Sequence, residues 1–194
     1  SNIFIKRNHK NIFITENKNN YLFQLAQKIK AEIIHHNNYI GGRYSVLSEV
    51  GMLPAELMGL NDMKFKKFNE LIKDKNFLNQ LILNVSATVE LIKRGKHNSI
   101  ILNYDESSEN LFQWYQQLIA ESLGKKSKGI LPVISTMPKD NHSLLQLYLD
   151  GPKNNFFTFF FTQDSVSEKI NKKLIQKSHN YLKNKTFSKI LHAQ

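Results

Sequence analysis

The chain has 194 residues, of which 41% are hydrophobic and 11% aromatic, a composition typical of a globular domain and unlike that of a disordered or fibrous protein. It contains no cysteine, which excludes disulfide bonds and thiolate metal sites. The net charge of +11 comes from lysines spread along the chain, without an RNA-binding signature or zinc-finger spacing, so we expect a basic solvated surface and no nucleic-acid partner.

Membrane insertion is not expected from the sequence. No apolar run approaches the roughly 20 residues needed to cross a bilayer, and the most apolar stretch, residues 156–161, predicts a short buried strand. The first residues lack the order of basic, apolar and small residues that a signal peptide has. We therefore expect a cytoplasmic protein with no membrane partner.

Strand and helix patterns alternate along the chain. In chain order, they predict a strand over residues 11–15, a helix over 21–29 and a strand over 31–34. A helical region over 46–60, interrupted by Gly51 and Pro54, and two helical patterns over 65–94 follow. The rest is predicted as a strand over 99–104, a helix that follows Ser107 and Ser108 and ends at Gly124, strands over 131–134 and 156–161, and a final helix over 167–182. Such alternation is typical of α/β proteins. We expect a single domain over residues 1–194, a three-layer αβα fold of the flavodoxin-like or Rossmann-like kind with a mainly parallel sheet of about five strands.

A glycine-rich turn follows the second predicted strand. In the motif GGRYSVLS (residues 41–48), Gly41 and Gly42 let the backbone turn tightly or approach a ligand, and they leave Arg43 at the edge of the turn. An arginine there can donate several hydrogen bonds to an oxyanion and stays charged at any working pH. The alternative is a surface turn whose arginine pairs with a nearby carboxylate.

The helix that ends at Gly124 carries a candidate general base. Gln117 and Glu121 are four residues apart, so on a helix they share a face and can reach one ligand. Because Glu121 falls in the last turn, the helix dipole disfavours its charge, and we expect a raised pKa that suits proton abstraction near neutral pH. The alternative is an exposed helix-end glutamate paired with Lys125.

Histidines provide the third candidate. His142 lies in a polar turn just before an apolar, helix-like run, where it could titrate near physiological pH and exchange protons with a substrate oxygen. The alternative is a loop histidine or a helix cap. The pair His35-His36 ends a strand without a partner at metal-ligand spacing, so we expect it to be structural and expect no metal site.

Together, three blocks of this sequence resemble the glucose-6-phosphate isomerase family. The blocks are GGRYSVLS (41–48) followed by Gly51 and Pro54, then Tyr104 and Trp114 followed by QLIAESLGK (117–125), and DNHS (140–143) followed by QLYLDGP (146–152). They stand in the family's order, and the similarity extends over most of the chain. The resemblance implies that the chain is the second sugar-isomerase (SIS) domain of such an enzyme.

The resemblance also implies a chemistry. Enzymes of this family interconvert glucose 6-phosphate and fructose 6-phosphate, in glycolysis and gluconeogenesis, without a metal or a redox cofactor. By resemblance, His142 moves a proton at the ring oxygen as the sugar opens, Glu121 carries a proton between C1 and C2 through a cis-enediol(ate), and Arg43 stabilises the enediolate charge. Gly42 and Gln117 are expected to hold the sugar. In the family the histidine usually comes from the neighbouring subunit, so the resemblance implies a homodimer.

Two elements of the family are not found in this sequence. The Gly-Gly-Ser turn and the Ser/Thr-rich loop that bind the phosphate belong to an earlier SIS domain, and a catalytic lysine belongs to a C-terminal helix. We therefore expect the sequence to be part of a longer enzyme, with little turnover by itself. Two alternatives stay open. One is a non-catalytic sugar-phosphate-binding SIS module, and the other is an aldose–ketose isomerase acting on a related sugar phosphate.

Overall fold

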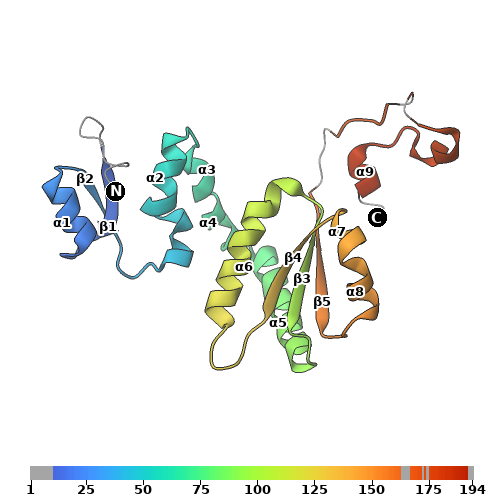
Figure 1. Cartoon of the computed structure of the whole chain (residues 1–194), viewed down its shortest axis with the longest axis horizontal. Helices are drawn as coiled ribbons and strands as arrows, with labels where there is room; N and C mark the ends of the chain where they lie inside the picture. The colour runs from blue at the N-terminus through green and yellow to red at the C-terminus, as the bar shows by residue number, and fades with distance from the viewer. Residues whose placement is uncertain (1–10, 163–166, 172, 174, 192–194) are drawn as a thin grey trace. The chain divides into compact units, whose positions relative to one another are not determined.

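The computed structural model describes residues 11–162, 167–171, 173 and 175–191 (Figure 1). The chain divides into two compact units, Ser1–Leu83 and Asn84–Gln194. We call them the N-terminal and the C-terminal unit and describe each by itself. The single domain expected over residues 1–194 stays a prediction.

The N-terminal unit begins with a strand–helix–strand motif. Strands β1 (Ile12–Glu16) and β2 (Glu32–His36) pair in parallel, and helix α1 (Tyr21–Lys28) connects them. The side-chain oxygen of Asn20 caps this helix by accepting a 2.9 Å hydrogen bond from the amide of Phe23. The motif confirms the first three predicted elements. The glycine-rich turn follows the carboxyl end of β2.

Helices form the rest of the N-terminal unit. They are the 3-10 helix η1 (Gly42–Leu47), α2 (Glu49–Leu57), α3 (Asp62–Lys66), α4 (Phe68–Leu71) and α5 (Lys75–Lys93), which continues into the C-terminal unit. The predicted interruptions at Gly51 and Pro54 are wrong, because α2 runs through both and the break falls at Ser48. Gly51 instead has a packing role: a β-carbon there would lie 1.9 Å from the backbone oxygen of Val46, so only glycine lets η1 lie this close to α2.

The C-terminal unit is built on a three-stranded parallel sheet in the order β4-β3-β5. Its first elements are β3 (Asn98–Asn103), η2 (Glu106–Ser108), α6 (Glu109–Leu123), β4 (Leu131–Thr136), α7 (Asp140–Ser143), α8 (Leu145–Asp150) and β5 (Asn155–Phe160). Figure 1 shows α6 and α8 on opposite sides of this sheet, which makes the three-layer α/β arrangement that the sequence predicts. The five strands of the described residues form two sheets instead of one, since β1 and β2 pair with each other in the other unit.

Both faces of this sheet are covered by apolar side chains. The buried cluster on one face comprises Ile100, Leu102 and Met137. Tyr148 of α8 packs against that cluster. On the other face the rings of Phe112 in α6 and Phe160 in β5 meet edge to face, with centroids 4.8 Å apart. This packing sets the positions of α6 and α8 relative to the strands.

The described residues between 167 and 182 do not form the single continuous helix predicted there. The described part of this region holds the 3-10 helix η4 (Lys177–Leu182), and α9 (Phe187–Leu191) follows it. Lys169 forms an antiparallel bridge with Thr186, and the amide of Ile170 donates to the oxygen of Lys185. These backbone groups bond across the chain, so they do not take part in a continuous helix. None of the helices in the described ranges combines the length and apolar character needed to cross a bilayer.

Candidate functional site

The motif at residues 41–48, which we call the Arg43 segment, is a short 3-10 helix held by its own serines. The hydroxyl of Ser45 donates to the oxygen of Gly42 at 2.7 Å, and the hydroxyl of Ser48 donates to the oxygen of Ser45 at 2.8 Å. Ser45 itself is buried. These bonds give the segment one defined backbone conformation between β2 and α2.

Arg43 lies half-buried on this segment, with its Cζ 4.9 Å from the ring centre of Tyr44. The two glycines before it are not required by the turn. Gly41 has φ −68° and ψ 156°, which any residue adopts, and a β-carbon at Gly41 or Gly42 would meet no heavy atom within 4 Å. Of the two reasons considered for these glycines, the geometry therefore favours open access to the backbone over a tight turn.

His36 joins the two ends of the Arg43 segment. Its Nε2 lies 3.0 Å from the oxygen of Ile40, just before the segment, and its Nδ1 lies 3.1 Å from Oε2 of Glu49, just after it. The hydrogen bond with Glu49, followed by the one with Ile40, raises the pKa of the His36 imidazole. The backbone amide of Glu49, followed by the hydrogen bond with His36, lowers the pKa of the Glu49 carboxyl. The sequence predicted a structural role for the histidine pair, but no pattern points to Glu49, because the two residues are 13 apart.

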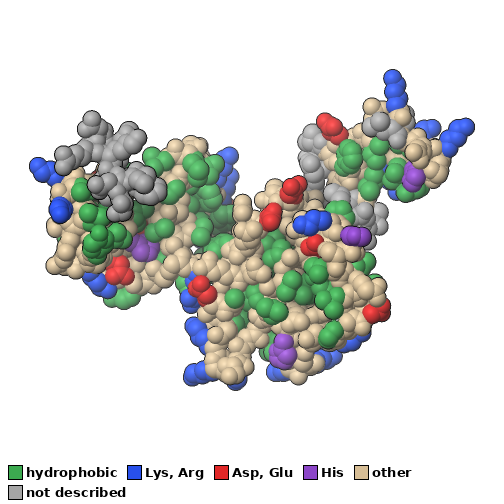
Figure 2. Space-filling model, in the orientation of Figure 1, with side chains coloured by type: hydrophobic (Ala, Val, Ile, Leu, Met, Phe, Trp, Pro, Cys, Tyr) green, Lys and Arg blue, Asp and Glu red, His purple; other side chains and the backbone are tan. Residues whose placement is uncertain are grey.

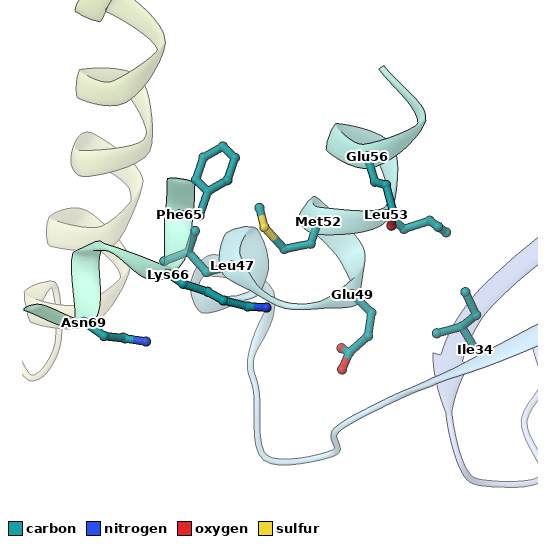
Figure 3. Close-up of a pocket in the computed structure, with 9 residues that line it drawn as sticks. All are labelled: Ile34, Leu47, Glu49, Met52, Leu53, Glu56, Phe65, Lys66 and Asn69. Atoms are coloured by element: carbon teal, nitrogen blue, oxygen red, sulfur yellow. The ribbon is translucent and has the colours of Figure 1, made fainter. Parts of the chain in front are cut away.

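A cavity of about 420 Å³ opens beside Glu49 in the N-terminal unit (Figure 3). Its walls are Ile34, Leu47, Glu49, Met52, Leu53, Glu56, Phe65, Lys66 and Asn69. Figure 3 shows the charged ends of Glu49 and Lys66 pointing into the same hollow. Leu47, the last residue of η1, is part of the wall, so the cavity adjoins the Arg43 segment. None of the five site residues predicted from the sequence lines it.

The predicted pair on α6 is found as expected. The side-chain amide of Gln117 donates a 3.1 Å hydrogen bond to Oε1 of Glu121, and both residues are exposed. Glu121 lies in the last turn, since Gly124 caps the helix with its amide bonded to the oxygen of Ala120. The pair therefore presents a carboxylate, held by a neighbouring amide, at the exposed end of a helix.

His142 lies in the one-turn helix α7, which replaces the polar turn expected there. Asp140 starts this helix and ties it to the sheet, because its Oδ2 accepts a 2.8 Å hydrogen bond from the amide of Thr136 at the end of β4. The hydroxyl of Ser143 donates to the other carboxylate oxygen at 3.1 Å. This network holds α7 at the carboxyl edge of the sheet and leaves His142 exposed.

Glu121 and His142 lie at opposite edges of the same sheet. Helix α6 starts near the carboxyl end of β3 and runs back towards the start of β4, where Gln116 donates to the oxygen of Pro132 at 2.8 Å. At about 1.5 Å per residue, α6 carries Glu121 roughly 18 Å from the carboxyl edge, where α7 lies. Figure 1 shows the end of α6 and the start of α7 at these two edges. One C-terminal unit therefore does not bring Glu121 and His142 together, and Arg43 and Gly42 belong to the other unit.

A second hollow of about 370 Å³ lies at the carboxyl edge of the three-stranded sheet. Its lining residues are Tyr104, Asp105, Glu106, Met137, Pro138, Phe161, Thr162, Ser167, Phe187 and Ser188. The hydroxyl of Ser108 hydrogen-bonds to Asp105 and is the main cause of a lowered pKa for that carboxyl, with Ser107 adding to it. Open α/β sheets bind ligands at this edge. Tyr104 belongs to the second motif block of the sequence, whereas no sequence pattern singled out Asp105.

No metal centre stands out among the residues that the structure describes, and no basic patch stands out on the face shown in Figure 2. Its His, Asp and Glu side chains nowhere gather in threes as metal ligands do. On the face shown in Figure 2, the described Lys and Arg side chains are scattered instead of forming one continuous surface. Of the residues predicted from the sequence, Gly42 and Arg43 belong to the N-terminal unit, and Gln117, Glu121 and His142 belong to the C-terminal unit.

Comparison with known proteins finds one family. The family model for phosphoglucose isomerase matches residues 24–136, which include Arg43, Gln117 and Glu121 and end before His142. A glucose-6-phosphate isomerase of Methanocaldococcus jannaschii is 38% identical over 139 residues, which are 69% of this chain and 35% of that protein. A glucose-6-phosphate isomerase of Mycoplasma capricolum is 32% identical over 187 residues, which are 92% of this chain and 44% of that protein.

A solved structure has the same fold. The crystal structure of a hypothetical protein from Thermus thermophilus matches with a TM-score of 0.77 and 26% identity, over 94% of this chain and 46% of that one. The chain thus spans less than half the length of these relatives.

Proposed function

The chain belongs to the phosphoglucose isomerase family, and from that premise we propose that it supplies the proton-transfer residues of a glucose-6-phosphate isomerase. The observation that carries the proposal is the Glu121 carboxylate, held by Gln117 at the exposed end of α6 and lying inside the matched region. The substrate is a sugar phosphate, and the activity is that of the whole protein, of which this chain is a part. A cytoplasmic location is part of the same proposal and rests on the sequence.

Glu121 acts as the base that carries one proton between neighbouring carbons. Its carboxylate takes the proton from C2 of open-chain glucose 6-phosphate, and the C–H electrons form the C1–C2 double bond of a cis-enediol(ate). The same carboxyl group returns the proton to C1 while the hydroxyl proton moves from O2 to O1, which yields fructose 6-phosphate. C1 is reduced as C2 is oxidised, so the step balances without a redox cofactor. Gln117 keeps the carboxylate in one orientation and has a second amide hydrogen for a sugar oxygen.

Arg43 and Gly42 bind the sugar near its C1 oxygen. As the C2 proton leaves, negative charge develops on the C1 oxygen, and a guanidinium placed there stabilises it in the transition state. The space around Gly42, with no atom within 4 Å of an added β-carbon, supports a close approach of the sugar to its backbone. A side chain at Gly42 would occupy that space.

His142 moves the proton at the ring oxygen when the sugar opens, and we propose that it reaches the site from a second copy of the chain. A general acid or base has to lie within about 2.6–3.2 Å of the atom it protonates. The position of Glu121 and His142 at opposite edges of one sheet supports a homodimer in which the active site takes the glutamate from one subunit and the histidine from the other.

The first test compares two glutamates on one helix. In the full-length protein, Glu121→Gln is expected to lower kcat for fructose 6-phosphate by about 10²- to 10⁴-fold, because the amide cannot accept the proton. Glu109→Gln changes an exposed carboxylate at the other end of α6 and is expected to leave kcat unchanged. If the intact protein binds the sugar phosphate without turning it over, it is a non-catalytic sugar-phosphate-binding module instead.

The second test addresses the shared site. Glu121→Gln and His142→Ala variants are each expected to be nearly inactive, and mixing their unfolded chains and refolding them yields mixed dimers. If each site draws on both subunits, one of the two sites in a mixed dimer is intact, and about a quarter of the wild-type activity returns. If both residues act within one subunit, every site retains one defect and the mixture stays inactive.

A further inference from the structure

The His36 side chain bridges two acceptors that flank the Arg43 segment. Its ring contacts the oxygen of Ile40 through Nε2 at 3.0 Å and the carboxylate of Glu49 through Nδ1 at 3.1 Å. The side chain of His36 is only 13% exposed, whereas that of Glu49 is 42% exposed. Together these two contacts close the chain from residue 40 to residue 49 into a loop, with Arg43 inside it.

The chemistry of the two partners defines the state of the ring. A peptide oxygen only accepts hydrogen bonds, and so does an ionised carboxylate. Both ring nitrogens must therefore carry a hydrogen to satisfy both contacts, which only the imidazolium form provides. A neutral imidazole has one N–H, so it keeps one contact and loses the other. The bridge is complete only while His36 is protonated and Glu49 is ionised.

We propose that His36 is a positioning residue, whose protonated ring holds the ends of the Arg43 segment together and so fixes the guanidinium against the substrate. The inference rests on the proposed function, since it acts through Arg43. Within the segment, the hydroxyls of Ser45 and Ser48 fix the backbone, so tying the two ends defines the place of the whole turn. The bridge adds what these serines do not provide, which is a link to β2.

Other charged groups face this bridge. Glu16, opposite His36 in the β1–β2 pairing, adds to the negative field at the imidazole and is itself paired with Lys18 at 3.1 Å. Lys66 of α3 lines the cavity that Glu49 also lines (Figure 3). Beyond Glu49 itself, one carboxylate and two ammonium groups thus surround the bridge, and the raised pKa of His36 agrees with the protonated ring that the geometry requires.

The pH range of the bridge follows from the two shifts. The raised pKa of His36 stabilises the fold fully below the ordinary value of 6.5, and this contribution is lost as the pH rises through the raised value. The lowered pKa of Glu49 stabilises the fold fully above its ordinary value of 4.5, and this contribution is lost as the pH falls through the lowered value. The bridge is therefore complete between pH 4.5 and 6.5 and opens on the alkaline side as His36 loses its proton.

The test uses the full-length enzyme and two readouts. His36→Ala is expected to lower kcat/KM by about 10- to 100-fold, since a small displacement of a charge-stabilising group costs this much. His35→Ala, at the neighbouring exposed position, is expected to have no such effect. Glu49→Gln keeps an acceptor and removes the charge, so it serves as a milder variant if His36→Ala unfolds. In each case thermal melting shows whether the protein is folded.

The first readout is coupling to Arg43. In an Arg43→Ala background, His36→Ala is expected to change kcat/KM by no more than about twofold, because the group it positions is gone. A full 10- to 100-fold loss in that background overturns the inference, while the role of Arg43 stands. If Arg43→Ala alone leaves the activity unchanged, the proposed role of Arg43 fails, and the positioning role fails with it.

The second readout is the pH dependence. Above pH 4.5, where Glu49 is ionised, the ratio of wild-type to His36→Ala kcat/KM is expected to be constant below the raised pKa of His36 and to fall towards one as the pH rises through it. A structural role that does not depend on the ring proton predicts a ratio independent of pH, and that result overturns the inference.

Discussion

Replacing Gly51 by alanine tests the packing that supports the Arg43 segment. A β-carbon at this position would lie 1.9 Å from the backbone oxygen of Val46 and 2.7 Å from its carbonyl carbon. Contacts of a β-carbon below 3.0 Å are essentially never found in proteins. The backbone of η1 or α2 therefore has to move by about 1 Å, and because the clashing atoms belong to the main chain, no side-chain rotation relieves the contact.

Two opposing terms set the size of the effect. Alanine in place of glycine inside a helix contributes up to about 1 kcal/mol of stability. Forcing extra atoms into a packed region costs about 1–3 kcal/mol, and a clash between backbone atoms belongs at the upper end of that range. We therefore expect Gly51→Ala to lower the free energy of unfolding by about 2 kcal/mol. For a chain of this length, that loss corresponds to a fall in Tm of about 4–8 °C.

Thermal unfolding followed by circular dichroism measures this change, with Gly41→Ala as the matched control. Gly41 lies in the Arg43 segment at φ −68°, and a β-carbon there meets no atom within 4 Å. The Tm of the Gly41→Ala protein is therefore expected to stay near the wild-type value. A Gly51→Ala protein as stable as the wild type would show that η1 does not pack on α2 as described. Equal losses from both substitutions would point to a general glycine effect and refute the steric reasoning in the same way.

Two further predictions concern the C-terminal unit. Tyr148→Phe removes the hydroxyl that lies 2.6 Å from the fully buried Ser135 Oγ, so urea unfolding is expected to show a free energy of unfolding lower by about 1–3 kcal/mol. Adding Ser135→Ala is expected to restore most of this loss, and additive losses in the double variant would contradict the prediction. Lys126 and Ser127 hold positive φ values of 53° and 59° in the two-residue turn between Lys125 and Lys128. Asn-Gly suits such a turn, so Lys126→Asn with Ser127→Gly is expected to raise the stability by about 1 kcal/mol, and an unchanged or lower urea midpoint would argue against a strained turn.

Local sequence patterns predicted the elements that carry most of the candidate site. The buried run around Ile100 forms β3, and the helix that ends at Gly124 places Gln117 and Glu121 on one face, joined by a 3.1 Å hydrogen bond. The spacing of residues along one helix is enough for such a prediction, because a helical turn brings residues four apart together wherever the helix lies. The three motif blocks likewise predicted the family that the comparisons show.

Local patterns failed where distant segments compete for the same backbone groups. The sequence predicted a final helix over residues 167–182, but the amide of Ile170 bonds to the oxygen of Lys185 instead. Gly51 was predicted to interrupt a helix, but its role is to let the backbone of Val46 approach α2 closely. In both cases the contact that decides the structure is made with a residue of another segment. The residue type was informative, but the contact that explains it could not be predicted from the local pattern.

The sequence by itself indicated which residues are candidates for the chemistry, whereas the tertiary structure decided at which ends of the sheet these candidates lie. Residue type and spacing made Arg43, Glu121 and His142 candidates with open alternatives, and the resemblance of the three motif blocks to the family singled them out. The antiparallel run of α6 against the sheet places Glu121 and His142 at opposite edges, and the fold of the N-terminal unit brings His36 to Glu49 across 13 residues. Such arrangements depend on strand pairing and on packing between elements, which are contacts between distant parts of the chain that no short stretch of sequence encodes.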